Sequence, residues 1–85
     1  MMYTVAWLKS AQDLLASIWI NASNRQAIAD AADAIDAQLR ADPYAYSESR
    51  ANKERVLLLP PLGVLFEVED ADSFVIVYAV WQIKT

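Results

Sequence analysis

The sequence predicts an α+β fold with the order strand, helix, helix and three-strand meander. We expect a small, mainly antiparallel sheet with a helical hairpin on one face. Apolar residues recur at helical spacing in the first half of the chain and alternate in short runs in the last third. The 85 residues fit one domain, residues 1–85, and the apolar fraction of 56% supplies ample core material.

The chain opens with a predicted strand over residues 2–8, where polarity alternates. A helix follows from Ser10 to about Asn21. Asp13 lies three residues after Ser10, and this spacing is typical of a capping box, in which the two side chains satisfy backbone N–H groups of the first turn. The apolar residues at helical spacing in this segment are Leu14, Leu15, Ile18 and Trp19.

A second, longer helix is predicted after Ser23, which forms another capping-box pattern with Gln26. We expect it to end near Arg40, because Pro43 disfavours helical geometry in the residue before it. An alanine-rich stripe on this helix allows close approach to the first one, which favours a helical hairpin. The carboxylates expected to form a solvated face on it are Asp30, Asp33 and Asp36.

The last third of the chain predicts strands over residues 55–59, 64–69 and 74–82. The first two are joined by a Pro-Pro-Leu-Gly turn, in which Gly63 supplies backbone freedom. The second turn covers residues 70–73. The final strand is apolar on both sides, which indicates a central place in the sheet.

Composition excludes several classes of chemistry. The chain has no cysteine and no histidine, so it lacks the usual zinc ligands, a thiolate nucleophile and the commonest general base. We therefore expect no metal and no cofactor. No apolar run reaches the roughly 20 residues that cross a bilayer, and no signal peptide is visible, which favours a cytoplasmic location without a membrane partner. The net charge of −4 argues against direct sequence-specific nucleic-acid binding.

With this order of elements the chain resembles the RelE/ParE superfamily of bacterial type II toxin–antitoxin toxins, which includes plasmid stabilisation proteins. The resemblance covers nearly the whole chain. An arginine-bearing strand with Arg55 precedes residues 63–68, Gly-Val-Leu-Phe-Glu-Val, which are similar to a tyrosine-rich strand of the family. Residues 75–81, Val-Ile-Val-Tyr-Ala-Val-Trp, are similar to its last strand. The resemblance implies a toxin that a cognate antitoxin covers.

Two mechanisms follow from this resemblance. The ribonuclease branch cleaves mRNA on the ribosome with basic side chains on the second and third strands and a basic or aromatic group after the last strand. Here the third-strand basic position falls on Gly63. The ParE branch binds DNA gyrase and cleaves nothing. We therefore expect a toxin that acts by binding, or one that binds antitoxin with weak or lost toxicity, and not an enzyme. The candidate residues for the alternative, a ribosome-dependent endoribonuclease, are Arg50, Lys53, Arg55, Tyr78 and Lys84.

The sheet has apolar residues for two faces, while the two helices cover only one. The other face is the expected antitoxin surface, with a homodimer through the same face as the rival interpretation. Alternation leaves open which side chains point to the partner. One register exposes Leu65, Ile76, Tyr78 and Val80; the other exposes Val64, Phe66, Val75, Val77 and Trp81. The candidate partner-binding residues are Arg50, Lys53, Arg55, Leu65, Ile76, Tyr78, Val80 and Trp81.

Overall fold

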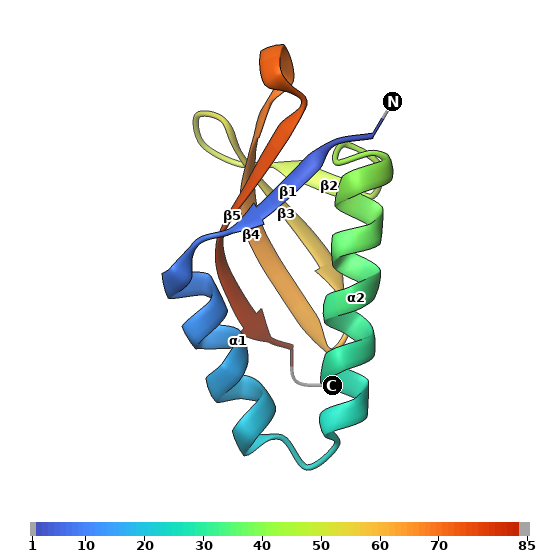
Figure 1. The fold of residues 1–85 in the computed structure, drawn as a ribbon, viewed down its shortest axis with the longest axis vertical. Helices are drawn as coiled ribbons and strands as arrows, with labels where there is room; N and C mark the ends of the chain where they lie inside the picture. Colours follow the sequence, from blue (N-terminus) through green and yellow to red (C-terminus); the bar gives the residue numbers. More distant parts are fainter. Residues whose placement is uncertain (1, 84–85) are drawn as a thin grey trace.

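The computed structural model describes residues 2–83 and confirms the predicted α+β fold, with two helices against one face of a five-stranded sheet (Figure 1). The strand order is β1-β5-β4-β3-β2. Strand β1 runs parallel to β5, and the other neighbours are antiparallel. The elements are β1 (Thr4–Trp7), α1 (Lys9–Asn21), α2 (Arg25–Ala41), β2 (Ser47–Ser49), β3 (Glu54–Leu59), β4 (Leu62–Glu69), the 3-10 turn η1 (Asp70–Asp72) and β5 (Phe74–Gln82).

The core lies between the helices and the near face of the sheet. Helix α1 packs mainly on β5, while α2 contacts β1, β3 and β4. The two helices contact each other less than they contact the sheet, so the predicted hairpin opens outward from its turn (Figure 1). Complete burial of each large apolar side chain contributes about 1.5–3 kcal/mol to folding. The largest core side chains are Ile28, Ile35, Leu39, Leu57, Leu62, Val64, Phe66, Val75 and Val77.

The capping prediction for α1 is wrong. The helix begins at Lys9, with Leu8 at the N-cap position and no side-chain capping bond. Asp13 instead pairs with Lys9 at 3.2 Å, one turn earlier on the same helix. The sequence pattern Ser10–Asp13 therefore lies inside the helix and does not form its start.

The cap of α2 is one residue later than predicted. The Asn24 side chain accepts a hydrogen bond from the backbone N–H of Ala27 at 3.1 Å, and so occupies the place expected for Ser23. Gln26 turns along the helix and donates to Asp30 at 2.8 Å. The chain between α2 and β3 contains one more short strand, β2.

The turn between β3 and β4 is tighter than predicted. Leu59 pairs with Leu62, so Pro60 and Pro61 alone make the connection, through a cis peptide bond. Gly63 consequently lies inside β4, without a positive φ, and does not supply the backbone freedom of a turn.

A β-bulge in β5 settles which side chains face the helices. Leu65 of β4 pairs with Ala79, but the next residue, Phe66, pairs with Val77, so Tyr78 has no partner across the ladder. An extra residue of this kind reverses the alternation of side chains beyond it.

Neither predicted register is therefore correct along the whole of β5. Val80, predicted to lie beside Ile76 on the partner face, is 4% exposed in the core. Trp81 takes the opposite face, where Ile76 also lies. In the part of the chain that the structure describes, no helix is long and apolar enough to cross a membrane.

Candidate functional site

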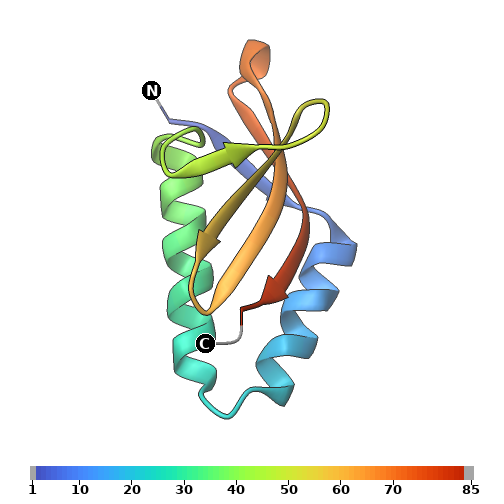
Figure 2. The ribbon, with the colours of Figure 1, turned by 180° about the vertical axis from the view of Figure 1, so that it is seen from behind.

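The face of the sheet turned away from the helices is not covered by any described element, as Figure 2 shows from behind. Strand register places on it the side chains that alternate with the core. We call this surface the uncovered sheet face. Leu58 is 54% exposed and Trp81 is 37% exposed on it. Its apolar residues are Val56, Leu58, Leu65, Phe74, Ile76, Ala79 and Trp81, and its acidic residues are Glu54, Glu67 and Glu69.

The acidic residues are concentrated at one place on this face. Glu54 and Glu67 are directly opposite each other on β3 and β4. Both are partly buried, and like charges in this position are destabilising. Burial raises the pKa of the Tyr78 hydroxyl, as do its hydrogen bond to Glu67 and the negative charges of Glu67, Glu69 and Glu54. The uncovered sheet face therefore surrounds Tyr78 with carboxylates, and a raised pKa makes it a poorer proton donor at neutral pH.

Two of the predicted cations, Arg50 and Lys53, form ion pairs with nearby carboxylates. Arg50 follows β2 and pairs with Glu48 at 3.1 Å. Lys53 precedes β3 and pairs with Glu69 at 3.7 Å. Both side chains are exposed, so each pair is weak. A phosphate site requires cations that are free of other partners and point to a common place. Arg50 and Lys53 each have a carboxylate partner of their own, so they do not form such a site.

The third predicted cation, Arg55, points to the other face. It is opposite the core residue Phe66 and lies on the helical side of the sheet. Its guanidinium donates to the Ser47 hydroxyl at 2.9 Å and to the Ser47 carbonyl at 3.2 Å, and it lies 5.0 Å from the centre of the Tyr44 ring. These contacts use its donors to hold β2 against β3. Lys84, the fifth candidate, lies outside the described residues.

Arg55 belongs to a network at the end of the sheet. The Tyr44 hydroxyl donates to Asp70 at 2.6 Å, and the Tyr3 hydroxyl donates to the same carboxylate at 3.2 Å. The hydrogen bond to Asp70, followed by burial, raises the pKa of Tyr44 to about 12. A shallow hollow of about 440 Å³ opens here, but the carboxylates lining it, Glu54, Glu69 and Asp70, outnumber its two cations. The network suits a structural role better than binding of an anion.

Gly63 has a packing role that the sequence did not reveal. A Cβ at this position would lie 2.7 Å from Cε2 of the Trp81 ring. Carbon atoms in contact are ordinarily about 3.5–4.0 Å apart. The glycine therefore lets the Trp81 indole lie flat on β4, and any longer side chain here, a basic one included, displaces the ring.

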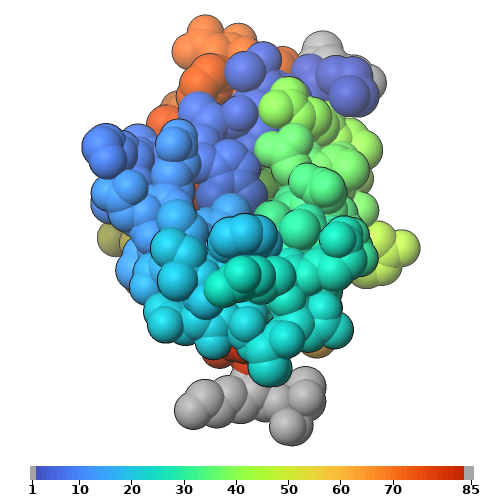
Figure 3. Space-filling model, turned by 60° about the horizontal axis from the view of Figure 1, so that its bottom comes forward, coloured from blue at the N-terminus to red at the C-terminus, as the bar shows by residue number. Residues whose placement is uncertain are grey.

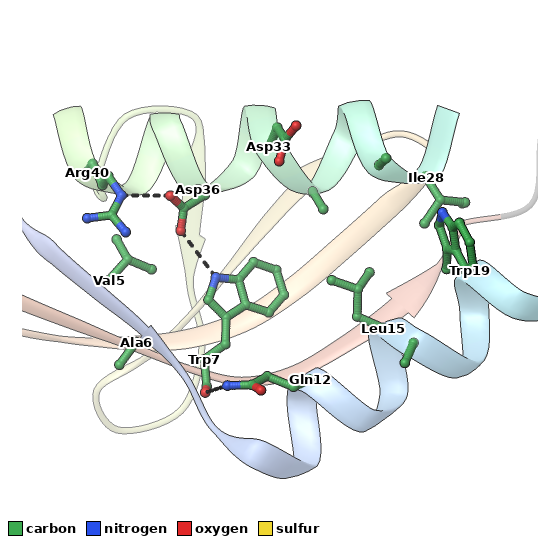
Figure 4. Close-up of a pocket in the computed structure, with 13 residues that line it drawn as sticks. Val5, Ala6, Trp7, Gln12, Leu15, Trp19, Ile28, Asp33, Asp36 and Arg40 are labelled. Carbon is green, nitrogen blue, oxygen red and sulfur yellow. Dashed lines mark hydrogen bonds and ion pairs between the residues drawn. The ribbon is translucent and has the colours of Figure 1, made fainter. Parts of the chain in front are cut away.

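A second concave surface lies between the helices, on the other side of the molecule. Figure 3 shows the two helices with the first strand between them, and Figure 4 shows the residues that line the groove, whose volume is about 820 Å³. Trp7 lies across it and donates its indole N–H to Asp36 at 3.3 Å. Asp36 in turn accepts from Arg40 at 2.6 Å. The prediction of a fully solvated acidic face is thus wrong for Asp36.

Sequence reasoning missed this groove for an identifiable reason. The spacing of Asp36 and Arg40, one helical turn, is readable from the sequence. The contact with Trp7 spans 29 positions and depends on the angle between the helices. Trp19, with the Arg25 guanidinium 4.8 Å from its ring centre, lines the same groove. Among residues 2–83, no group of three or more acidic side chains is arranged to hold a metal ion.

Comparison with known proteins identifies the fold. No protein-family model and no curated protein sequence matches this chain. Among solved structures, it is similar to the toxin–antitoxin complex RelBE2 from Mycobacterium tuberculosis, with a TM-score of 0.81, 14% identity, and coverage of 96% of this chain and 99% of that one. It is also similar to the isolated RelE toxin of E. coli, with a TM-score of 0.67, 13% identity, and coverage of 98% and 86%. The chain therefore has the fold of the RelE/ParE-like toxins, as its sequence predicted.

Proposed function

We propose that this chain is the toxin component of a type II toxin–antitoxin module and that it acts in the cytoplasm by binding another protein. The observation that carries this proposal is the chemistry of the uncovered sheet face. It combines exposed Leu58 and Trp81 with the carboxylates of Glu54, Glu67 and Glu69. A surface that holds a scissile phosphate needs cations, and carboxylates repel RNA. A docked protein segment needs no such cations.

The similar structure from M. tuberculosis was determined as a complex of toxin and antitoxin, which supports an antitoxin as one partner of this chain. Beyond the antitoxin, the proposal includes a cellular target such as DNA gyrase, inhibited by binding. A chain that retains antitoxin binding with weak or lost toxicity fits the same observations. Both versions require a protein-binding surface and no acid–base set.

One observation favours the alternative function, a ribosome-dependent mRNA endoribonuclease. Both similar structures contain toxins of the RelE type. Catalysis would then depend on Arg50, Lys53 and Arg55. For Arg55 to reach a phosphate on the uncovered sheet face, it would have to leave Ser47 and Tyr44 and cross to the other side of β3.

The test is controlled expression in a bacterium that lacks the antitoxin, followed by growth curves and mapping of mRNA 5′ ends. We expect growth arrest with intact mRNA, or no arrest with capture of the small protein encoded beside the gene. Cuts positioned within codons of translated mRNA, lost on Arg55→Ala but kept on the exposed control Arg25→Ala, would establish the nuclease instead. No arrest and no neighbouring partner would overturn the toxin assignment itself.

A further inference from the structure

We infer that the uncovered sheet face docks a cationic amphipathic segment of the antitoxin, one with an apolar stripe flanked by lysine or arginine side chains. This inference deepens the proposed function and rests on it for the identity of the partner. The chemistry of the segment follows from the surface itself. The sequence placed the cations Arg50, Lys53 and Arg55 among the candidate partner-binding residues. On the uncovered sheet face, however, the charges without an ion pair among residues 2–83 are the carboxylates of Glu54 and Glu67, so a complementary partner carries positive charge.

Trp81 and Leu58 form the apolar part of the docking surface. Trp81 lies flat on β4 because Gly63 leaves room for its ring. Leu58 pairs with Gly63 from β3, so the two large side chains flank the same glycine and remain exposed. Tryptophan is among the residues that contribute most to binding at protein interfaces, and Leu58 extends the exposed apolar area beside Trp81.

Glu54 and Glu67 form the charged part of the docking surface. Within residues 2–83 neither carboxylate takes part in an ion pair, although each is partly buried and faces the other across the β3–β4 ladder. Glu69 has only the distant Lys53, at 3.7 Å. A lysine or arginine from a partner would relieve the repulsion between the two carboxylates and gain from their reduced hydration. An acidic segment would add to the repulsion.

The same charges argue against two other occupants. A second copy of this chain, joined by a two-fold axis that passes near Glu54 and Glu67, would bring these carboxylates against the same carboxylates of the other copy. A nucleic acid would bring phosphates against them. The groove between the helices is a weaker candidate for a cationic segment, because Arg40 neutralises Asp36 there and, among residues 2–83, leaves Asp33 as its single carboxylate without an ion pair.

The test uses the full chain and two designed helical peptides of about 18 residues, long enough to form a stable helix on a surface. Both carry the same leucine stripe, flanked by lysines in one peptide and by glutamates in the other. Binding is measured by fluorescence anisotropy of labelled peptide at about 0.15 M salt, where long-range attraction is screened. The test variant is Glu54→Gln with Glu67→Gln. The matched control is Asp30→Asn with Asp33→Asn on α2, away from the uncovered sheet face, which removes two negative charges as well. Asp33 lines the groove between the helices, so this control also reports binding there.

We expect the lysine peptide to bind and the glutamate peptide not to bind. Neutralising Glu54 and Glu67 should weaken binding roughly tenfold, whereas the control on α2 should change it by less than about twofold. Leu58→Ser should weaken binding without changing the circular dichroism spectrum. Equal losses in the two double variants, tight binding of the glutamate peptide, or no binding of either peptide would each overturn the inference. None of these results bears on growth arrest or on the existence of an antitoxin, so the proposed function is tested separately.

Discussion

The close approach of Gly63 and Trp81 gives the sharpest prediction of stability. A methyl group added at Gly63 would lie 2.7–2.8 Å from three atoms of the indole, about 1 Å inside normal contact. Overpacking of this kind costs about 1–3 kcal/mol. Alanine in a strand is itself favoured over glycine by about 0.5–1 kcal/mol. We therefore expect Gly63→Ala to lower the free energy of unfolding by about 1–2 kcal/mol.

The assay is a double-mutant cycle with Trp81→Ala, followed by urea unfolding and far-ultraviolet circular dichroism. In the Trp81→Ala background the clash is absent, so Gly63→Ala should become neutral or stabilising by about 0.5–1 kcal/mol. The coupling energy between the two positions should then be about 1–3 kcal/mol. In a domain of this size, each kcal/mol corresponds to a shift of about 4–8 °C in Tm.

A coupling energy below about 0.5 kcal/mol, the usual limit for independent sites, would refute the packing argument. The result also bears on function. If the ring of Trp81 must move before any side chain fits at Gly63, then Gly63→Arg alone cannot restore a basic third-strand position in an otherwise unchanged sheet.

Three further predictions concern the fold. Phe66→Ala removes a fully buried ring and should destabilise the protein by about 3–5 kcal/mol in urea unfolding; a loss below 1 kcal/mol would mean that the ring is not in the core. Asn24→Ala should cost about 0.5–2 kcal/mol by loss of the α2 cap, while Ser23→Ala should change little; the reverse order would restore the sequence-based assignment. Tyr44→Phe should remove a tyrosinate absorbance step near pH 12. Because the folded-state pKa of Tyr44 is raised from 10.0 to about 12, its contribution to stability is complete below pH 10 and is lost as the pH rises through 12. Because the pKa values of Tyr3 and Tyr78 are also raised, the comparison is of amplitude: a step near pH 12 that is equally large in the wild type and in Tyr44→Phe would contradict the Asp70 hydrogen bond.

The order and type of the elements could be predicted from the sequence because hydrophobic periodicity reports them directly. Strand β5 was placed correctly from Phe74 to Gln82, and its central position between β1 and β4 agrees with its apolar composition. The helix caps were misplaced by one or two residues, since several polar residues near each helix start have similar capping propensity. Only the local geometry distinguishes Asn24 from Ser23.

The sequence could not predict which side chains of β5 point to the uncovered sheet face, because this depends on one β-bulge. A bulge at Tyr78 changes no residue type and leaves no compositional signal, yet it moves Val80 into the core and Trp81 to the uncovered sheet face. The side of Arg55 depends in the same way on the register between β3 and β4, which the two-proline turn sets. Of the residues that form one basic cluster in the sequence, Lys53 and Arg55 line one hollow at the end of the sheet, but their charged groups have separate partners: Glu69 for Lys53, and Ser47 with Tyr44 for Arg55.

The proposal that this protein acts by binding and not by cleaving RNA is tested most directly with purified components. The protein is added to ribosomes paused on a defined mRNA, and primer extension then reports whether the message is cut. We predict full-length mRNA at every concentration at which the protein stays folded, with the same result for Arg55→Ala. Cleavage within the codon held by the ribosome, abolished by Arg55→Ala in a variant that remains folded, would show instead that the protein is a ribosome-dependent nuclease.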